Sequence, residues 1–382
     1  MAATEAPRRL LYLTGTRADF GLMAATLQCI QATPGLSVQL VVTGMHLSAE
    51  HGMTIDEVRA SGLPVCAELP LDMQTRTGRS MAEGLADCLR GLCDVLERER
   101  PDAVLLLGDR GEMLAGALAA LHMGVPSVHL HGGERSGTID EPVRHAISKL
   151  ASYHFAATEA SRERLVRMGE APERVFVTGA PGIDGLADLA IADRAQALAA
   201  LGLPAGSEFI LALFHPVVQQ AEQAGAQTLA LAQALGDSGL PVLWLDPNAD
   251  AGSQAILQAL EAGTLPAGSR RVTHLGRPLF ATAMRHGTVM VGNSSAGIIE
   301  AATFGTPVVN VGDRQRLRER GPHILDVPAT REAIAEAIRT QRRHGRWPCE
   351  NAWGDGHAAE RIAHLLATLP LDASVLEKTN AY

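Results

Sequence analysis

The feature that most limits the fold of this chain is a regular alternation of short apolar runs with longer amphipathic stretches. In the first half, the apolar runs predict buried strands at Arg9–Thr14, Val38–Thr43, Ala103–Leu107, Pro126–Leu130, His154–Ala157 and Arg174–Thr178. The intervening stretches predict helices at Leu22–Ala32, Met81–Arg98, Glu112–Met123, Glu141–Ala151 and Glu159–Met168. Repeated βα units with continuously apolar strands are typical of parallel sheets that helices cover on both faces.

The same alternation returns in the second half. It predicts strands at Phe209–Phe214, Pro241–Leu245, Arg271–Leu275, Thr288–Val291 and Thr306–Asn310. It predicts helices at Gln220–Leu235, Gln254–Ala262, Leu279–Arg285, Ala296–Phe304 and Arg331–Gln341. Between Gly179 and Gly206 the pattern pauses, and a length of 382 residues suits two domains. We therefore expect an α/β protein with one Rossmann-like, doubly wound domain over residues 1–185 and another over 186–365, facing each other across a cleft. A tail over residues 366–382 is expected to pack back on the first domain.

Composition excludes several classes of function. The net charge of −9 argues against a protein that coats nucleic acid, and only 13 aromatic residues argue against stacking on flat bases. No apolar run approaches the roughly 18 residues of a membrane span. The five cysteines are scattered without a CxxC pair, and no signal-peptide pattern precedes the first strand. We expect a cytoplasmic protein with no nucleic-acid or membrane partner.

Glycine is abundant, with 38 residues, and several glycines fall where a strand turns into a helix. The first such turn, Thr14–Gly21, is neither GxGxxG nor a P-loop. Free N–H groups of the following helix, with Arg17 beside them, would suit an anion. A tight turn with a surface arginine explains the same residues equally well.

The second turn, Gly292–Glu300, contains adjacent serines, Ser294 and Ser295, at a predicted helix start. Their hydroxyls and the helix N–H groups predict a phosphate cradle, and Glu300 would accept hydrogen bonds from ribose hydroxyls. The alternative is an ordinary N-cap with an acidic first turn. Four arginines follow within residues 313–320, and we choose Arg314 as the one that binds phosphate. Together these residues indicate a nucleoside diphosphate.

Ionisable residues crowd the predicted strand ends of the first half. Asp109 follows one strand, and His131, Glu134 and Asp140 follow the next. Such density at the end of a buried strand predicts proton-transfer chemistry by carboxylates and a histidine. A zinc site built on His129 and His131 with Asp109 or Glu134 is a less favoured alternative, and we expect no metal. N-caps and ion pairs account for Glu141 and Arg144.

Several motifs, in order over nearly the whole chain, resemble those of the hydrolysing UDP-N-acetylglucosamine 2-epimerases, in particular the bacterial enzymes of sialic-acid-type sugar synthesis. The resemblance is carried by Thr14–Gly21, Thr43–Leu47, Gly108–Arg110, His129–Glu141 with Arg144–Leu150, Phe214–Pro216, Pro247–Ser253, Gly292–Glu300 and Gly312–Gln315.

The resemblance implies a GT-B fold, with UDP held mainly by the second domain and no cofactor. It assigns nucleotide or substrate binding to Arg17, His46, Asn293, Ser294, Ser295, Glu300 and Arg314. It assigns chemistry to Asp109, His131, Glu134, Asp140 and His215. The animal enzymes carry Glu at the position of His131, so the identity of the base stays open. The family also implies a homodimer or homotetramer.

The implied reaction converts UDP-N-acetylglucosamine and water to N-acetylmannosamine and UDP, by elimination to a 2-acetamidoglucal and hydration. An alternative is the same chemistry on UDP-2,4-diacetamido-2,4,6-trideoxyglucose, in legionaminic acid synthesis. More distant alternatives are a non-hydrolysing epimerase, a GT-B glycosyltransferase and a nucleotide-sugar sensor.

Overall fold

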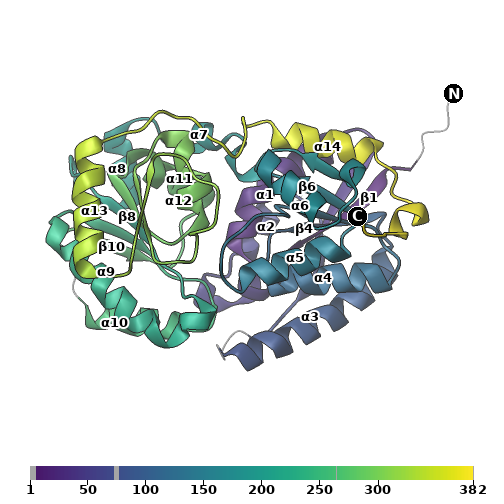
Figure 1. The fold of residues 1–382 in the computed structure, drawn as a ribbon, viewed down its shortest axis with the longest axis horizontal. Helices are drawn as coiled ribbons and strands as arrows, with labels where there is room; N and C mark the ends of the chain where they lie inside the picture. The colour runs from purple at the N-terminus through teal and green to yellow at the C-terminus, as the bar shows by residue number, and fades with distance from the viewer. Residues whose placement is uncertain (1–5, 73–76, 264, 382) are drawn as a thin grey trace.

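The computed structural model describes residues 6–72, 77–263 and 265–381, and the described chain contains two parallel sheets (Figure 1). The first sheet has the strand order β3-β2-β1-β4-β5-β6-β7. Its strands are β1 (Arg8–Thr14), β2 (Leu36–Thr43), β3 (Val65–Leu69), β4 (Ala103–Leu107), β5 (Ser127–Leu130), β6 (Tyr153–Ala156) and β7 (Val175–Val177). All pairings are parallel, as the continuously apolar strands predicted.

The second sheet repeats this plan with the order β10-β9-β8-β11-β12-β13. Its strands are β8 (Ile210–Leu213), β9 (Val242–Leu245), β10 (Arg270–Val272), β11 (Val289–Gly292), β12 (Val308–Val311) and β13 (Ile324–Val327). In Figure 1 the two sheets lie in the two halves of the molecule, with loops from both halves meeting between them. The prediction of two doubly wound, Rossmann-like α/β sheets is confirmed.

Helices cover both faces of the first sheet. They are α1 (Arg17–Ala32), α2 (Ile55–Ala60), α3 (Gly78–Glu99), α4 (Gly111–His122), α5 (Asp140–Leu150) and α6 (Glu159–Arg167). Alternate residues of β1 enter different cores, because successive side chains of a strand point to opposite faces. Leu10 and Tyr12 pack with α1, whereas Leu11 and Leu13 pack with α3 and α4.

The second sheet is covered in the same way. Its helices are α7 (Leu186–Leu189), α8 (Arg194–Leu201), α9 (Ala224–Ser238), α10 (Ser253–Ala262), α11 (Arg277–His286), α12 (Ser295–Ile299) and α13 (Arg331–His344). One core contains α9, α10 and α13, and the other contains α8 and α11. Short 3₁₀ segments are η1 (Gly44–Leu47), η2 (Ala49–His51), η3 (Pro172–Arg174), η4 (Pro181–Ile183), η5 (Val218–Gln223), η6 (Ala301–Phe304) and η7 (Ala373–Leu376).

The chain returns to the first sheet at its end. Helix α14 (Ala358–Thr368), yellow in Figure 1, packs against α1, and Ile362 and Leu366 join the core that contains Leu10. The domain limits remain predictions, but the chain returns to the first half before residue 366. The carbonyl oxygen of Trp353 accepts from the backbone N–H of Ala180, and Ala358 joins the core that contains Leu10. Among the described residues, no helix is both long enough and apolar enough to cross a membrane.

Both sheets reverse their strand order at an inner pair, β1 and β4 in the first sheet and β8 and β11 in the second. Loops at the carboxyl ends of such a pair diverge to opposite faces of the sheet and leave a crevice, where ligands of open α/β sheets bind. Gly292 ends β11, and a Cβ there would lie 1.7 Å from the carbonyl oxygen of Leu213 in β8. Only glycine therefore lets these two strand ends approach so closely.

Candidate functional site

The predicted acids of the first half converge at the carboxyl ends of β4 and β5. Asp109 follows β4, and Asp140 is the first residue of α5. Asp109 is tied to the loop after β5 by Arg144, whose side chain has no exposed surface. One guanidinium nitrogen of Arg144 pairs with Asp109 and another donates to the carbonyl oxygen of Glu134 at 3.0 Å. A buried guanidinium thus fixes two loops of the predicted site.

His131 and Glu134 form a buried pair beside these acids. His131 has a φ of 61°, which is uncommon for a residue with a side chain and marks the sharp turn after β5. Its Nδ1 hydrogen-bonds the Glu134 carboxylate, which leaves Nε2 as the nitrogen for proton transfer. Burial would raise the pKa of Glu134, but the nearby Arg318 and His131 outweigh it and lower the pKa. Glu134 is therefore ionised and orients the imidazole.

The structure argues against His129 as a zinc ligand. Both ring nitrogens of His129 have partners, the carbonyl oxygen of Gly108 at 2.7 Å and the hydroxyl of Ser148 at 3.0 Å. Burial lowers the pKa of His129 to about 3, so the ring is neutral. Over residues 6–72, 77–263 and 265–381, no three His, Cys, Asp or Glu side chains are grouped as a metal site would require.

The first glycine-rich turn differs from the open anion site that we considered. The carboxylate of Asp19 accepts hydrogen bonds from the backbone N–H groups of Gly15 at 3.1 Å and Thr16 at 2.8 Å. The turn therefore already holds an internal anion, although burial raises the pKa of Asp19 to about 6. The side chain of Arg17, at the same turn, faces the second half and donates to the carbonyl oxygen of Thr273.

His46 lies in the interior and not in the cleft. Its side chain is fully buried, with Nε2 2.9 Å from the hydroxyl of Thr14 and Nδ1 2.8 Å from that of Thr54. Burial lowers the pKa of His46 to about 4. In this arrangement His46 supports the turn after β1, and its contact with substrate stays a prediction.

In the second half, Asn293 and His215 join the ends of β11 and β8. The carboxamide of Asn293 accepts from the backbone N–H of His215 at 2.8 Å and donates to its carbonyl oxygen at 2.8 Å. His215 Nδ1 accepts from the backbone N–H of Asn248 at 3.2 Å. Burial, with the charges of Arg314, Arg17 and Arg110, lowers the pKa of His215 well below its ordinary value. His215 is therefore a neutral ring whose Nε2 carries the proton.

The serine turn follows Asn293. Ser294 is the N-cap of α12 and accepts from the backbone N–H of Ala296 at 3.3 Å, so the capping alternative is confirmed for Ser294. Ser295 begins the helix, which has only five residues. Glu300 lies at its C-terminal end, because the predicted helix Ala296–Phe304 is divided there into α12 and η6. Glu300 is buried and pairs with Arg277, which also donates to the carbonyl oxygen of Gly182.

Two of the four clustered arginines reach across to the acids. Arg314 donates to the carbonyl oxygen of Asn293 at 3.2 Å and lies 3.6 Å from Asp140. Arg318 pairs with Glu134 and lies 4.0 Å from Asp109. Of these two arginines, only Arg314 was predicted from the sequence, and Arg318 was missed. The density of arginine in an acidic chain was the available signal, but it did not distinguish the two from their solvated neighbours.

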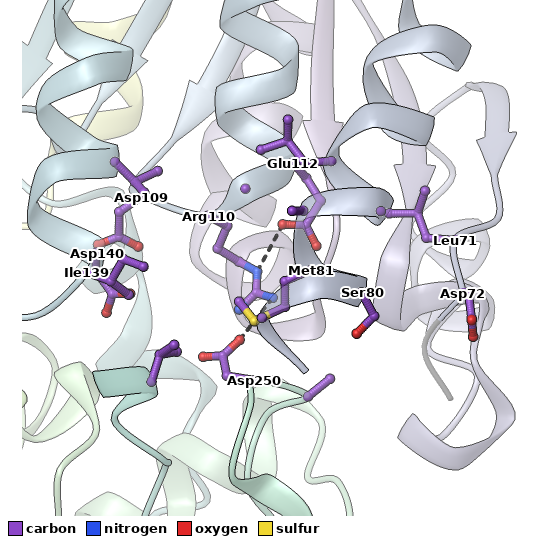
Figure 2. A pocket seen from close by; sticks show the side chains of 18 of the residues that line it. Leu71, Asp72, Ser80, Met81, Asp109, Arg110, Glu112, Ile139, Asp140 and Asp250 are labelled. Atoms are coloured by element: carbon purple, nitrogen blue, oxygen red, sulfur yellow. Dashed lines mark hydrogen bonds and ion pairs between the residues drawn. The ribbon is translucent and has the colours of Figure 1, made fainter. Parts of the chain in front are cut away.

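A pocket of about 320 Å³ opens between these loops and the start of α3 (Figure 2). Its polar wall contains Asp109, Asp140, Arg314 and a further arginine, Arg110, which was not among the predicted site residues. Arg110 lies between Glu112 at 3.3 Å and Asp250 of the second half at 3.6 Å. Apolar side chains also line the pocket, among them Leu71, Met81, Leu85, Ile139, Val143, Val218 and Ala249. Figure 2 shows Ile139 next to the two aspartates and Met81 close to Arg110.

Two doubly wound sheets, with Asp109 and Asp140 from one and Arg314 from the other lining one pocket, define a GT-B-type α/β protein with its site between the sheets. The model of the family UDP-N-acetylglucosamine 2-epimerase matches residues 28–367. The chain is 44% identical over 375 residues to a hydrolysing UDP-N,N'-diacetylbacillosamine 2-epimerase of Legionella pneumophila, covering 98% of this chain and all of the relative. It is 32% identical to a UDP-N-acetylglucosamine 2-epimerase of Neisseria meningitidis, covering 94% and 95%.

The crystal structure of a Neisseria meningitidis UDP-GlcNAc 2-epimerase bound to UDP-GlcNAc matches the fold with a TM-score of 0.76 at 22% identity, over 94% of this chain and 99% of that one. The chain belongs to the UDP-N-acetylglucosamine 2-epimerase family. The predicted class of enzyme, a hydrolysing UDP-sugar 2-epimerase, is confirmed.

Proposed function

We propose that the substrate of this enzyme is UDP-2,4-diacetamido-2,4,6-trideoxyglucose, another name for UDP-N,N'-diacetylbacillosamine. It is converted with water to UDP and the 2,4-diacetamido-2,4,6-trideoxy sugar of manno configuration. The sequence alone had placed UDP-N-acetylglucosamine first. The Legionella relative, 44% identical over its whole length, supports the diacetamido sugar instead.

The observation that carries this proposal is the apolar lining of the pocket. Met81 and Ile139 are 40% and 39% exposed, although both line a pocket that also contains Asp109 and Asp140. Exposed apolar side chains at an enzyme cleft are explained when a ligand covers them. A 6-deoxy sugar presents a methyl group where N-acetylglucosamine presents a hydroxymethyl group, and the 4-acetamido group adds a second methyl. Both methyl groups suit contact with Met81, Leu85 and Ile139.

The proposed chemistry begins with removal of the proton at C2 of the sugar. The bond between C1 and the diphosphate oxygen breaks, and its electron pair leaves with UDP while C1 and C2 become doubly bonded. Water then adds its oxygen to C1, and a proton is delivered to C2 on the opposite face, which gives the manno product. Asp109, Asp140 and the His131–Glu134 pair supply the acids and bases for these transfers.

Charge grows on the diphosphate as the C1 bond breaks. Arg314 and Arg17, from opposite sides of the cleft, are placed to stabilise it together with Ser294 and Ser295. Neutral His215 would donate a hydrogen bond from Nε2, and Glu300 would accept from the ribose hydroxyls. Asn293 acts through His215, which it holds with two hydrogen bonds.

The test is incubation of the enzyme with each UDP-sugar in D₂O, followed by proton and phosphorus NMR. We expect free UDP and a manno sugar deuterated at C2, with the higher kcat/KM for the diacetamido substrate. A higher kcat/KM for UDP-N-acetylglucosamine would overturn the substrate. A product that retains UDP, or a C2 position without deuterium, would overturn hydrolytic epimerisation.

A further inference from the structure

Arg318 is a second-domain residue whose charged group lies among the acids of the first domain. Its Nη1 pairs with the Glu134 carboxylate, and its Nη2 lies 4.0 Å from Asp109. The side chain is only 9% exposed, and its guanidinium lies 5.9 Å from the ring centroid of Trp353. An arginine so buried is held in one place, so its contact with Glu134 is a fixed part of this arrangement of the domains.

The loop that carries Arg318 also carries Arg314. Buried Gln315, between them, donates to the carbonyl oxygen of Asn293 at 3.2 Å, the same atom that Arg314 contacts. Gln315 in turn accepts at its own carbonyl from the backbone N–H of Arg318 at 3.1 Å and from Arg320 at 2.7 Å. One braced loop therefore joins the turn expected to hold UDP to the acids expected to move protons.

The groups around Glu134 come from several elements. His131 of the same loop binds its carboxylate, Arg144 of α5 donates to its backbone carbonyl oxygen, and Asp109 after β4 lies near Arg318. From the neighbouring helix α6, Arg164 binds the carbonyl oxygen of Gly133 and lies 3.7 Å from Glu319 of the arginine loop. The Glu134 carboxylate itself is held between His131 on one oxygen and Arg318 on the other.

We propose that Arg318 is a positioning residue, which holds the His131–Glu134 pair in place from the opposite domain and so completes the acid–base site only while the Arg314 loop is docked. The proposal rests on the proposed function, because it takes His131 as a group that transfers protons. It assigns to Arg318 a role in the chemical step and none in holding UDP. Placement of a base within hydrogen-bond reach matters steeply, since a shift of about 1 Å can cost ~100-fold in rate.

The experiment compares Arg318→Gln and Arg318→Lys with Arg316→Gln, a matched control on a more exposed arginine of the same loop. We expect Arg318→Gln to lower kcat by about 100-fold, with the affinity for UDP changed less than about threefold. Arg318→Lys should recover part of kcat, because a cation returns near Glu134. Arg316→Gln should match the wild type in both measurements. A parallel loss of UDP affinity in Arg318→Gln, or an unchanged kcat, would overturn the proposal.

A readout independent of turnover separates this proposal from the proposed function. The ¹⁵N chemical shifts of the His131 imidazole, measured by NMR at constant pH in UDP-bound enzyme, report its hydrogen bond to Glu134. We expect Arg318→Gln to change these shifts, because Glu134 loses the cation on its other oxygen, and Arg316→Gln to leave them unchanged. Unchanged shifts in Arg318→Gln would overturn the positioning role even where the enzyme is active. Failure of the wild type to turn over any UDP-sugar, with the shifts changed, would overturn the proposed function alone.

Discussion

The carboxamide of Asn293 spans the ends of β11 and β8 through two 2.8 Å hydrogen bonds to the backbone of His215. Asn293→Asp would keep the acceptor but replace the donor with an oxygen that repels the His215 carbonyl. We expect a loss of roughly 2–3 kcal/mol in the free energy of unfolding and a UDP affinity weakened about 10-fold, because His215 loses its support. Urea unfolding and titration calorimetry measure the two effects.

Asn351 provides the control for that prediction. Its side chain donates to the carbonyl oxygen of Ile299 at 2.7 Å and accepts from the backbone N–H of Trp353 at 3.0 Å. Asn351→Asp should therefore lower the free energy of unfolding by a similar amount. It should leave UDP affinity within about threefold of the wild type once stability is accounted for. Equal losses of UDP affinity in both variants would argue against a specific role of Asn293.

Asp140→Asn should abolish turnover and leave UDP binding largely intact. The change removes a proton-transfer group, which contributes ~10²–10⁴-fold to rate in enzymes, but it leaves Arg314 in contact with Asn293. Asp109→Asn should lose activity equally and also lower stability, because the buried Arg144 loses its charged partner. Steady-state kinetics with calorimetry of UDP binding tests both variants. Near-normal activity in either would remove that aspartate from the mechanism.

Met81→Gln should reduce the preference for the diacetamido substrate. The methionine side chain offers apolar contact in the proposed sugar pocket, and a single methyl contact in such a pocket is worth ~1–3 kcal/mol. We expect kcat/KM for the diacetamido sugar, relative to that for UDP-N-acetylglucosamine, to fall about 10-fold. Met123→Gln, on a similarly exposed methionine outside this pocket, should leave the ratio unchanged. An unaltered ratio in Met81→Gln would place the sugar elsewhere.

The central strands of both sheets were predictable from the sequence because they are buried along their length. β4 is one example, with all five residues inside. The edge strands β3 and β13 were missed for the complementary reason. Val65–Leu69 and Ile324–Val327 are half covered and carry an acidic residue each, so no continuous apolar run marks them. Helix α14 was missed although its buried residues Ala358, Ile362 and Leu366 recur at helical spacing, and its contact with α1, more than 300 residues away in sequence, has no local signal.

The site was predictable where it depends on strand ends and unpredictable where it depends on the meeting of two domains. Asp109 and Asn293 follow the strands at which the sheet order reverses, and that position can be inferred from alternation alone. The pairing of Arg318 with Glu134 spans 184 residues and two sheets, and no periodicity encodes it. His46 also follows a strand, but its side chain turns inward to two threonine hydroxyls, and the sequence pattern does not show this direction.

Glu300→Ala should weaken UDP binding by about 10-fold or more, because a charged hydrogen bond to ribose is worth roughly 1.5–3 kcal/mol. The structure adds a competing explanation, since Glu300 also neutralises Arg277. Binding of 2',3'-dideoxyuridine diphosphate separates the two. A ribose contact predicts that Glu300→Ala weakens UDP but not the dideoxy nucleotide, and the wild type should bind the dideoxy form more weakly. Equal weakening of both nucleotides would assign Glu300 to the support of Arg277.

The tail of the chain is anchored by a buried carboxylate, Glu170. Its oxygens contact Lys149 at 2.9 Å, His154 at 2.8 Å and Lys378 at 2.6 Å, and Lys378 also donates to the carbonyl oxygens of Ser148 and Ala151 at the end of α5. Burial would raise the pKa of Glu170, but the hydrogen bonds from His154, Lys378 and Lys149 outweigh it and lower the pKa from 4.5 to about 2. Because the folded pKa is depressed, the stabilisation is present above about pH 4.5 and is lost as the pH falls toward 2.

Glu170→Gln should therefore cost roughly 3–5 kcal/mol in the free energy of unfolding at pH 7, because it leaves the largely buried ammonium of Lys378 without its counter-charge. Glu163→Gln, which removes an exposed partner of Arg167 at 3.0 Å, should cost less than about 1 kcal/mol. Lys378→Met should destabilise the wild type more than it destabilises Glu170→Gln, since the two residues interact directly. Thermal unfolding from pH 7 to pH 3 should show the difference in Tm between wild type and Glu170→Gln shrinking below pH 4.5. A difference that stays constant over this range would contradict an ionised Glu170 as the anchor of the tail.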